Sequence, residues 1–287
     1  MAEIFGTVAG ALSVAALFNN CVDCFEYVQL GRRFGRDYER CQLKVKIAQT
    51  RLSRWGQAVA IHEDARFAAA SPTDAPTQQV QSILVEIEML FQSLQKTSKR
   101  YELGAKQEDL ALFRDGDMQP AFRRLCGRLE GVVRQRQKET SLVKKTAWAL
   151  YDGKNLDRLV EHLTGFVDDL EKIYPVEAAR QLAEVDIEMV DDATDLMAVS
   201  NAAAGIDTAL AEAAAEKAEG IAVKNYAGKI ETGEEARVRV GNEMDASIFS
   251  GGGIADRTTN TADMVDARGK SRVHIGNKYG GRGILDD

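Results

Sequence analysis

Apolar residues recur at intervals of three and four through the first three quarters of the chain, the spacing of a single buried helix face. The clearest run lies between Asn155 and Tyr174 and is ended by Pro175. No convincing alternation of apolar and polar residues occurs before residue 220. We therefore predict an all-α bundle of six to nine helices, with further helices at residues 37–66, 83–94 and 176–215, and one from 122 continuing towards Trp148.

The N-terminal segment, residues 4–22, contains no charged residue. As a helix it would rise about 28 Å, close to the hydrocarbon thickness of a bilayer. Its G-x-x-x-G pair is a spacing at which helices approach closely in lipid. We expect a core helix that is buried in the resting bundle and able to insert into a membrane. The candidate membrane-helix residues are Gly6, Gly10, Leu12, Leu17 and Phe18.

The last quarter of the chain contains a repeat with a spacing of 35 residues. Residues 225–242 align with residues 260–277, and six of the 18 aligned positions are identical. Each copy holds a short alternation typical of a half-buried β-strand, RVRV in the first and RVHI in the second. Stacked in parallel register as two windings, the copies would place like residues about 4.8 Å apart. The open edges of such a stack can accept a winding from another chain.

Charges in the two copies fit this stack only in part. Glu235 aligns with Lys270, an attractive pair, whereas Glu231 aligns with Asp266 and Arg237 with Arg272. The like-charged pairs are repulsive unless they are exposed. Half of the 24 glycines lie after residue 219, so we expect the tail to be disordered before it is templated.

Composition narrows the class of function. The formal net charge of −7 disfavours a general nucleic-acid binder. The segment from Arg123 to Lys145 contains eight basic residues and only two acidic ones. This basic run is interpreted as a solvated helix face or as a surface that attracts anionic lipid headgroups. Nucleic acid is the weaker interpretation because no aromatic residues are interleaved, and it would predict a steeply salt-dependent affinity.

Cysteine and histidine content gives no support for metal, redox or catalytic chemistry. Four cysteines and no leader-like N-terminus favour a reducing, intracellular compartment. Cys21 and Cys24 form a C-x-x-C, but the context is helical and apolar and a second ligand pair is lacking, so we interpret both as small buried residues. None of the usual nucleophile, metalloprotease or phosphate-binding motifs occurs. We predict no enzyme activity and no cofactor.

Several segments resemble the HET-s/HET-S family of fungal heterokaryon-incompatibility proteins. They are FGTVAGALSVAALFNNCVDCFEYVQLG, KKTAWALYDGK, and the copy ends RVRVGN and RVHIGN. The resemblance implies a helical HeLo domain at residues 1–217 and a prion-forming domain at residues 218–287. That second domain would be a two-winding β-solenoid in the amyloid state.

The resemblance also implies which residues form the amyloid core. In the first winding they are Ala227, Ile230, Thr232, Ala236, Val238 and Val240. In the second they are Ala262, Val265, Ala267, Ser271, Val273 and Ile275, with Asn225, Asn242, Asn260 and Asn277 as ladders. The chain departs from the family's charge pattern at Gly228 and Gly233, which bring no charge to face Asp263 and Arg268. The Glu235–Lys270 pair has its signs reversed.

The function implied by the resemblance is amyloid-templated signalling in heterokaryon incompatibility and fungal programmed cell death. Solenoid formation would disrupt the helical domain and release a membrane-inserting N-terminal helix. The implied partners are copies of the chain itself (a fibril, or a dimer when soluble), an allelic HET-s/HET-S-type protein, a STAND-class receptor with a matching repeat, and a membrane on activation. No nucleic acid is expected, and the resting protein would be cytoplasmic. The alternative is a helical adaptor or scaffold with a disordered tail.

Overall fold

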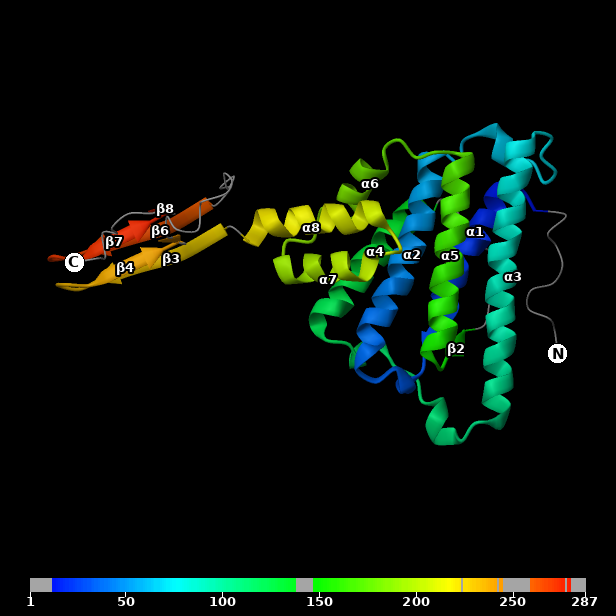
Figure 1. The fold of residues 1–287 in the computed structure, drawn as a ribbon, viewed down its shortest axis with the longest axis horizontal. Coiled ribbons are helices and arrows are strands. Elements are labelled where there is room, and N and C mark those ends of the chain that lie inside the picture. The colour runs from blue at the N-terminus through cyan, green and yellow to red at the C-terminus, as the bar shows by residue number, and fades with distance from the viewer. Residues whose placement is uncertain are drawn as a thin grey trace. The chain divides into compact units, whose positions relative to one another are not determined.

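The structure is a computed structural model that describes residues 12–137, 147–222, 224–241, 243–244, 259–276 and 278–279. Contacts divide the chain into a helical unit, Met1–Ala215, and a tail unit, Glu216–Asp287 (Figure 1). The boundary that we predict, between residues 217 and 218, lies two residues further along the chain. Both positions fall inside the last helix, so secondary structure is continuous where the contacts divide.

The helical unit is built from α-helices with short 3-10 turns between them. The α-helices in the described ranges are α1 (Val14–Cys24), α2 (Tyr38–Ala58), α3 (Ala75–Gly104), α4 (Pro120–Arg136), α5 (Gly153–Ile173), α6 (Ala179–Asp186), α7 (Ala193–Ala203) and α8 (Thr208–Ala222). The 3-10 turns are η1 (Phe25–Tyr27), η2 (Arg32–Asp37), η3 (Ala65–Phe67), η4 (Gln107–Leu110) and η5 (Asp115–Asp117). The fold class predicted from the apolar spacing is confirmed for this unit.

Local sequence explains where these helices begin and end. Ser13, Asp74 and Asp152 precede α1, α3 and α5, and each side chain accepts a hydrogen bond from a backbone N–H in the first turn, at 3.2, 2.9 and 2.9 Å. Such caps satisfy donors that the helix itself leaves unpaired. Pro175 lies two residues beyond the end of α5, as the sequence predicts.

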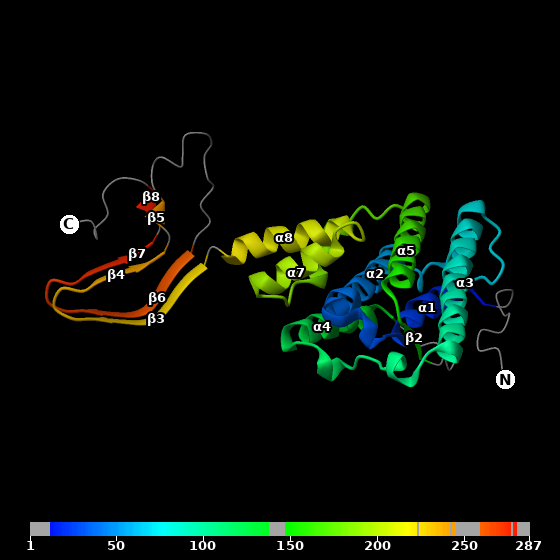
Figure 2. The ribbon, with the colours of Figure 1, turned by 60° about the horizontal axis from the view of Figure 1, so that its bottom comes forward.

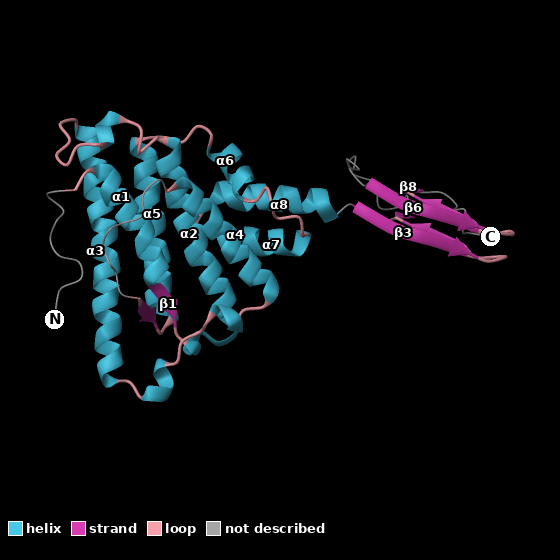
Figure 3. Cartoon of the chain, turned by 180° about the vertical axis from the view of Figure 1, so that it is seen from behind, coloured by secondary structure: helices cyan, strands magenta, loops and turns pink. Residues whose placement is uncertain are grey.

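The core of the helical unit is centred on α2, which packs against α1, α4, α5, α6 and α7. Figure 3 shows α1, α2, α3 and α5 running side by side, with α4 and α7 beyond α2. Leu43, Ile47, Leu52 and Trp55 of α2 are at most 1% exposed. The three-and-four spacing therefore identifies its buried face correctly.

Several predicted helices differ from those in the structure. The helix expected over residues 37–66 ends at Ala58, and the segment 176–215 forms α6, α7 and the first part of α8 in place of one helix. Two further helices are shorter than the sequence suggests. Ser13 has extended backbone angles, φ −65° and ψ 159°, so α1 begins at Val14 and a continuous helix over residues 4–22 is wrong. The helix that begins near Phe122 ends at Arg136 and does not reach Trp148. Uncharged residues continue before the start of α1 and basic residues continue after the end of α4. The cap residues nevertheless set both boundaries.

Two short strands in the helical unit escape the sequence analysis. β1 (Val28–Leu30) pairs in parallel with β2 (Trp148–Leu150), and Val28 faces Trp148. All three residues of β2 are buried. Three apolar residues in a row carry no period, so a strand this short cannot be told from a buried helix segment.

In its described residues, the tail unit contains the end of α8 and six strands that pair two by two. The strands are β3 (Lys224–Thr232), β4 (Arg237–Val240), β5 (Glu243–Met244), β6 (Thr259–Ala267), β7 (Arg272–Ile275) and β8 (Lys278–Tyr279). The pairs are β3 with β6, β4 with β7 and β5 with β8, all parallel. Figure 2 shows each copy as a bent ribbon, with the second copy following the path of the first.

Candidate functional site: the tail strand stack and the buried N-terminal helix

Every described pair of tail strands keeps the same offset along the chain. Ala227 faces Ala262, Val238 faces Val273, and Glu243 faces Lys278. These partners follow the 35-residue repeat, so the two copies lie in parallel, in-register contact. A constant offset over three strand pairs means that each copy is one winding and that the second winding repeats the path of the first.

Backbone hydrogen bonds continue between the windings through the bend that joins the strands. Arg268 N–H donates to the Thr232 carbonyl at 3.3 Å, and Lys270 N–H donates to the Glu234 carbonyl at 2.7 Å. Arg272 N–H then donates to the Ala236 carbonyl at 2.7 Å. The evenly spaced bonds are those of a parallel ladder. The bend therefore belongs to the stack and is not a loose connection between two separate sheets.

Two glycines at the end of the RVRVG and RVHIG segments have a backbone that other residues rarely adopt. Gly241 has φ +123° and Gly276 has φ +140°. A Cβ on Gly241 would also lie 2.6 Å from the Gly276 carbonyl oxygen, which no side chain can accept. The repeated glycine thus lets both windings turn at the same place in close contact.

The amyloid-core residues implied by the resemblance differ in burial within one chain. Ile230 and Thr232 of the first winding are 6% and 7% exposed. Ala227, Ala236, Val238, Val240, Ala262, Ser271 and Val273 are half-buried, whereas Val265, Ala267 and Ile275 are exposed. A single chain supplies one neighbour to each winding, so apolar surface stays uncovered. Val265 and Ile275, at 42% and 39% exposure, are the largest uncovered members of the set.

Polar residues inside the stack pair across the windings. The Thr232 hydroxyl donates to Ser271 Oγ at 2.9 Å, and Ser271 donates to the Arg268 carbonyl at 2.8 Å. Asn225 and Asn260 occupy facing positions in the register. The other two predicted ladder residues, Asn242 and Asn277, lie outside the described residues. Pairing of this kind offsets the cost of covering polar groups between the two windings.

The like-charged pairs of the stack find compensation within each winding. Glu231 faces Asp266, but Glu231 forms an ion pair with Lys229, and Asp266 forms one with Arg268 at 2.6 Å. Arg237 faces Arg272 and both side chains are exposed. The repulsion expected from the aligned sequence is therefore either neutralised locally or screened by water.

The N-terminal helix α1 is part of the core of the helical unit. Leu17 and Phe18 are 0% and 2% exposed, and Leu12 before the helix is half-buried. The Phe18 ring lies 6.1 Å from the Trp55 ring, and a Cβ on Gly56 would lie only 2.1 Å from Phe18 Cζ. Gly56 thus provides the space on α2 into which α1 places its aromatic ring.

The described part of α1 does not resemble a membrane span in length. Its 11 residues rise only about 16 Å. Among the helices in the described ranges, none is long and apolar enough to cross a bilayer. Gly6 and Gly10 of the predicted membrane helix lie outside the described residues.

The C-x-x-C cysteines lie on the buried face of α1. Cys21 is fully buried and its thiol donates to the Leu84 carbonyl at 3.2 Å, and Cys24 is 2% exposed. Both are in the thiol form. In the part of the chain that the structure describes, no group of three or more metal-ligating side chains is found. The interpretation of these residues as small core residues agrees with their burial.

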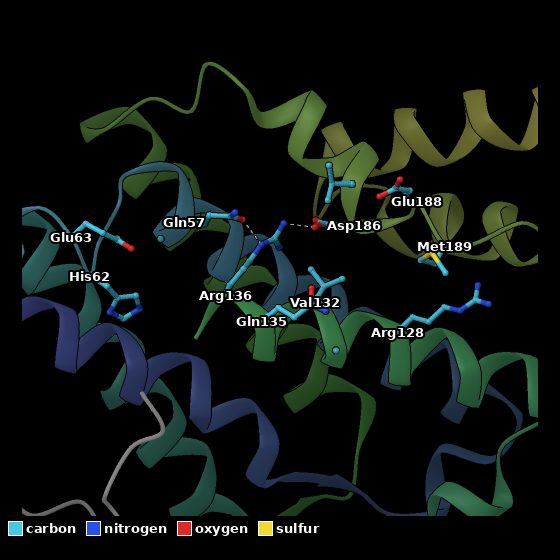
Figure 4. Close-up of a pocket in the computed structure, with 13 residues that line it drawn as sticks. Gln57, His62, Glu63, Arg128, Val132, Gln135, Arg136, Asp186, Glu188 and Met189 are labelled. Atoms are coloured by element: carbon cyan, nitrogen blue, oxygen red, sulfur yellow. Dashed lines mark hydrogen bonds and ion pairs between the residues drawn. The ribbon is translucent and has the colours of Figure 1, made fainter. Parts of the chain in front are cut away.

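A buried ion cluster that the sequence analysis misses joins α2, α4, α6 and α8. The Arg54 guanidinium contacts Asp186 at 2.7 Å and Asp207 at 2.8 Å, and all three residues are at most 3% exposed. Arg136 forms an ion pair with Asp186 and donates to Gln57 at 2.5 Å, and Figure 4 shows it between them. A cavity of about 440 Å³ lies beside Arg136.

Burial and the neighbouring carboxylates act in opposite directions on the two arginines of this cluster. Burial opposes the charge of Arg54, but Asp207 and Asp186 outweigh it and raise its pKa above the ordinary value. Burial lowers the pKa of Arg136 in spite of Asp186. Asp207 also caps α8, accepting from the Leu210 N–H at 3.1 Å. The sequence does contain a signal for a buried arginine, because the helical spacing places Arg54 on the same face as the apolar Leu43 and Ile47.

The basic run is not one uniform surface. Arg136 is 7% exposed and belongs to the ion cluster, which contradicts a fully solvated face. Arg123 donates to the Met118 carbonyl at 3.0 Å, and the 69%-exposed Arg134 lies 4.0 Å from Glu26. Residues 138–145 of the run lie outside the described residues.

Comparison with known proteins identifies relatives of both units. The sequence pattern of the family described as HeLo, "Prion-inhibition and propagation", matches residues 6–199. That of the family described as "Het-s 218-289" matches residues 217–280. The chain is 56% identical over 289 residues to heterokaryon incompatibility protein s of Podospora anserina and 55% identical to heterokaryon incompatibility protein S of the same species, with both chains covered completely.

The helical unit also matches solved structures. A structure of the HET-s N-terminal domain superimposes with a TM-score of 0.72 at 59% identity, covering 74% of this chain and all of the other. A second structure of that domain, with two substitutions, gives a TM-score of 0.71 at 58% identity. It covers 73% of this chain and all of its own.

Proposed function

Because the chain belongs to the HET-s/HET-S family of heterokaryon-incompatibility prion proteins and carries both a HeLo domain and a prion-forming domain, we propose that it passes a conformational signal by amyloid templating. A folded tail offers its open windings to the tail of another copy, which adopts the same solenoid. Solenoid formation disrupts the helical unit, and the N-terminal segment is released to enter a membrane. The family is not one of enzymes, and no catalytic step is part of the proposal.

The observation that carries the proposal is the constant offset of the parallel tail strands. A second copy placed on the stack would set its first winding against the second winding already present. All side chains would then face the partners that they face within one chain, such as Val238 with Val273. The interface between chains would repeat the interface within a chain, so growth needs no new set of contacts.

The backbone of β7 supports an edge that is ready to pair. Arg272 N–H and Gly276 N–H donate to the first winding. Successive N–H groups of a strand point to opposite sides, so Val273 N–H and Ile275 N–H face away from it. In the described residues each tail sheet has two strands. The outward donors therefore form a row that a further winding satisfies.

The burial of α1 supports a resting state in which its apolar surface is kept from lipid. Leu17 and Phe18 are buried against the rest of the helical unit. Release would require both side chains to leave this core, and a longer helix would have to form from residues 4–22 to span a bilayer. The described resting helix is shorter than that, so insertion would include both release and extension.

We further propose the partners that follow from this mechanism. Another copy of the chain is the first, as a fibril and as a dimer of the resting form. An allelic HET-s/HET-S-type protein and a STAND-class receptor with a matching repeat are sources of template. The resting protein acts in the cytoplasm and associates with membrane on activation, and nucleic acid has no part in it.

Seeded membrane leakage tests the proposal. Full-length protein is mixed with dye-loaded anionic vesicles and with preformed fibrils of the chain. We expect leakage only when fibrils are present, and Gly10→Asp should abolish it because a charge at mid-span costs about 2.5–3.5 kcal/mol on insertion scales.

Gly127→Asp is the matched control. It makes the same change on the exposed face of α4, where a Cβ meets nothing within 4 Å, and its leakage should equal that of the wild type. Leakage by folded Gly10→Asp protein would refute insertion of the N-terminal segment. A tail that stays monomeric whatever the concentration would instead favour a helical adaptor.

A further inference from the structure

A tyrosine takes the place of the charge that is lacking opposite Asp263. Ala227 faces Ala262 and Lys229 faces Met264, so the register places Gly228 opposite Asp263. Gly228 has no side chain to offer. The hydroxyl of Tyr226, two residues earlier, donates a hydrogen bond to the Asp263 carboxylate across the windings.

The glycine and the tyrosine fit each other. Residues two apart on a strand point to the same face, so Tyr226 lies on the side of the strand where the Gly228 side chain would be. A Cβ built on Gly228 would lie 3.6 Å from Tyr226 Oη and 3.8 Å from its Cε1. The Tyr226 ring therefore lies along the space that a side chain on Gly228 would occupy. Its hydroxyl reaches Asp263 diagonally, and long side chains can span such diagonal pairs between neighbouring strands.

Other charged side chains near the two strands already form ion pairs with each other. Lys229 forms an ion pair with Glu231, and Arg268 forms one with Asp266. Tyr226 is 67% exposed, so its hydrogen bond lies at the outer surface of the stack. The hydrogen bond to Asp263 and the charge of that carboxylate raise the pKa of Tyr226.

We propose that Tyr226 is a specificity-determining residue of templating, which selects a winding that carries a carboxylate at the position of Asp263; this rests on the function proposed above. In a fibril, the first winding of one chain lies against the second winding of the next. The same register then places Tyr226 of one copy within reach of Asp263 of another. Each chain contributes one phenol donor and one carboxylate, so donors and acceptors match along the stack.

A double-mutant cycle on the full-length chain tests the proposal. Tyr226→Phe, Asp263→Ala and the double variant are assembled with wild-type fibrils as seeds, and the concentration of chain that stays soluble is measured. Tyr226→Phe keeps the ring but leaves the carboxylate without its donor, and should raise that concentration about fivefold. The soluble concentration of the double variant should be no higher than that of the poorer single variant, because the two substitutions remove the same interaction.

Changes at Gly228 provide the rescue and the control. Gly228→Lys added to Tyr226→Phe places a cation directly opposite Asp263 and should return the soluble concentration to within about twofold of the wild type. Gly228→Ala introduces only ordinary contacts with Tyr226 and should change nothing.

The outcomes separate this proposal from the function on which it rests. Equal soluble concentrations for wild type and Tyr226→Phe, or effects of the two single variants that simply add, would overturn the role of Tyr226 while leaving templating intact. Failure of the wild type to be seeded at all would overturn both.

Discussion

Arg54 places a full positive charge among packed helices, and two carboxylates from distant parts of the chain neutralise it. Asp186 ends α6 and Asp207 caps α8. Charges buried in this way cost desolvation, and their pairing holds only while both partners are present. The cluster therefore links the start of α8 to α2, and α8 is the last helix before the tail strands.

Removing the cation should destabilise the helical unit strongly. In Arg54→Met, Asp186 keeps Arg136 as a partner, but the buried Asp207 carboxylate has no guanidinium to neutralise it. We expect the free energy of unfolding to fall by about 3–5 kcal/mol, measured by urea unfolding followed by circular dichroism. Lys172→Met removes an exposed ion pair with Asp169 and should have almost no effect. A decrease no larger for Arg54→Met than for Lys172→Met would contradict this account.

At the residue scale the sequence predicts apolar burial better than polar contacts. The faces of α2 and α5 follow from spacing because burial of apolar surface is non-directional. The partners of Arg54 do not follow, because Asp186 and Asp207 lie 132 and 153 residues away. The Tyr226–Asp263 contact is missed for a related reason: the aligned partner of Asp263 is a glycine, and the donor comes from a diagonal position.

The contact of α1 with α2 depends on a glycine at the crossing point. A Cβ at Gly56 would lie 2.1 Å from Phe18 Cζ, and the ring is 2% exposed. The resting position of the N-terminal helix thus depends on one small residue of its neighbour.

Gly56→Ala should loosen α1 from the bundle. Overpacking of this kind costs about 1–3 kcal/mol, against the gain in helix propensity that alanine brings. Gly127→Ala on α4 brings the same gain with no clash and should stabilise the protein by about 0.5–1 kcal/mol. Thermal unfolding of both variants decides the matter. If Gly56→Ala is stabilised as much as Gly127→Ala, Phe18 does not pack as described.

Element boundaries show where sequence patterns fail. The register of β3 with β6 is predictable because the repeat itself specifies the partner of each residue. The start of α1 is not, because Ser13 competes for the N–H of Ala16 and stops an apolar run that would otherwise continue as helix. β2 is missed because the residues that surround it are far away in sequence.

At the scale of the whole molecule, two regimes share one chain. In its described residues, the helical unit buries large side chains such as Trp55 and Phe91 almost fully. The described part of the tail unit leaves Val265 and Ile275 exposed, and each of its sheets has two strands. In the proposed function, a second copy of the chain covers this exposed surface, so assembly completes what one chain leaves open. Disorder of the tail before templating stays a prediction.

Seeding of the full-length chain by its own fibrils tests templating most directly when Val273→Pro is compared with Arg272→Ala. Proline at 273 removes an N–H that faces the open edge and fixes φ near −65°, while the hydrogen bond from Arg272 to the first winding keeps its donor. Arg272→Ala removes an exposed side chain that faces Arg237 and keeps the backbone N–H of residue 272. We predict that Val273→Pro protein stays folded in its helical unit and is not seeded by wild-type fibrils, whereas Arg272→Ala is seeded as fast as the wild type or faster. Equal seeding of the two variants would contradict the stacked-winding mechanism.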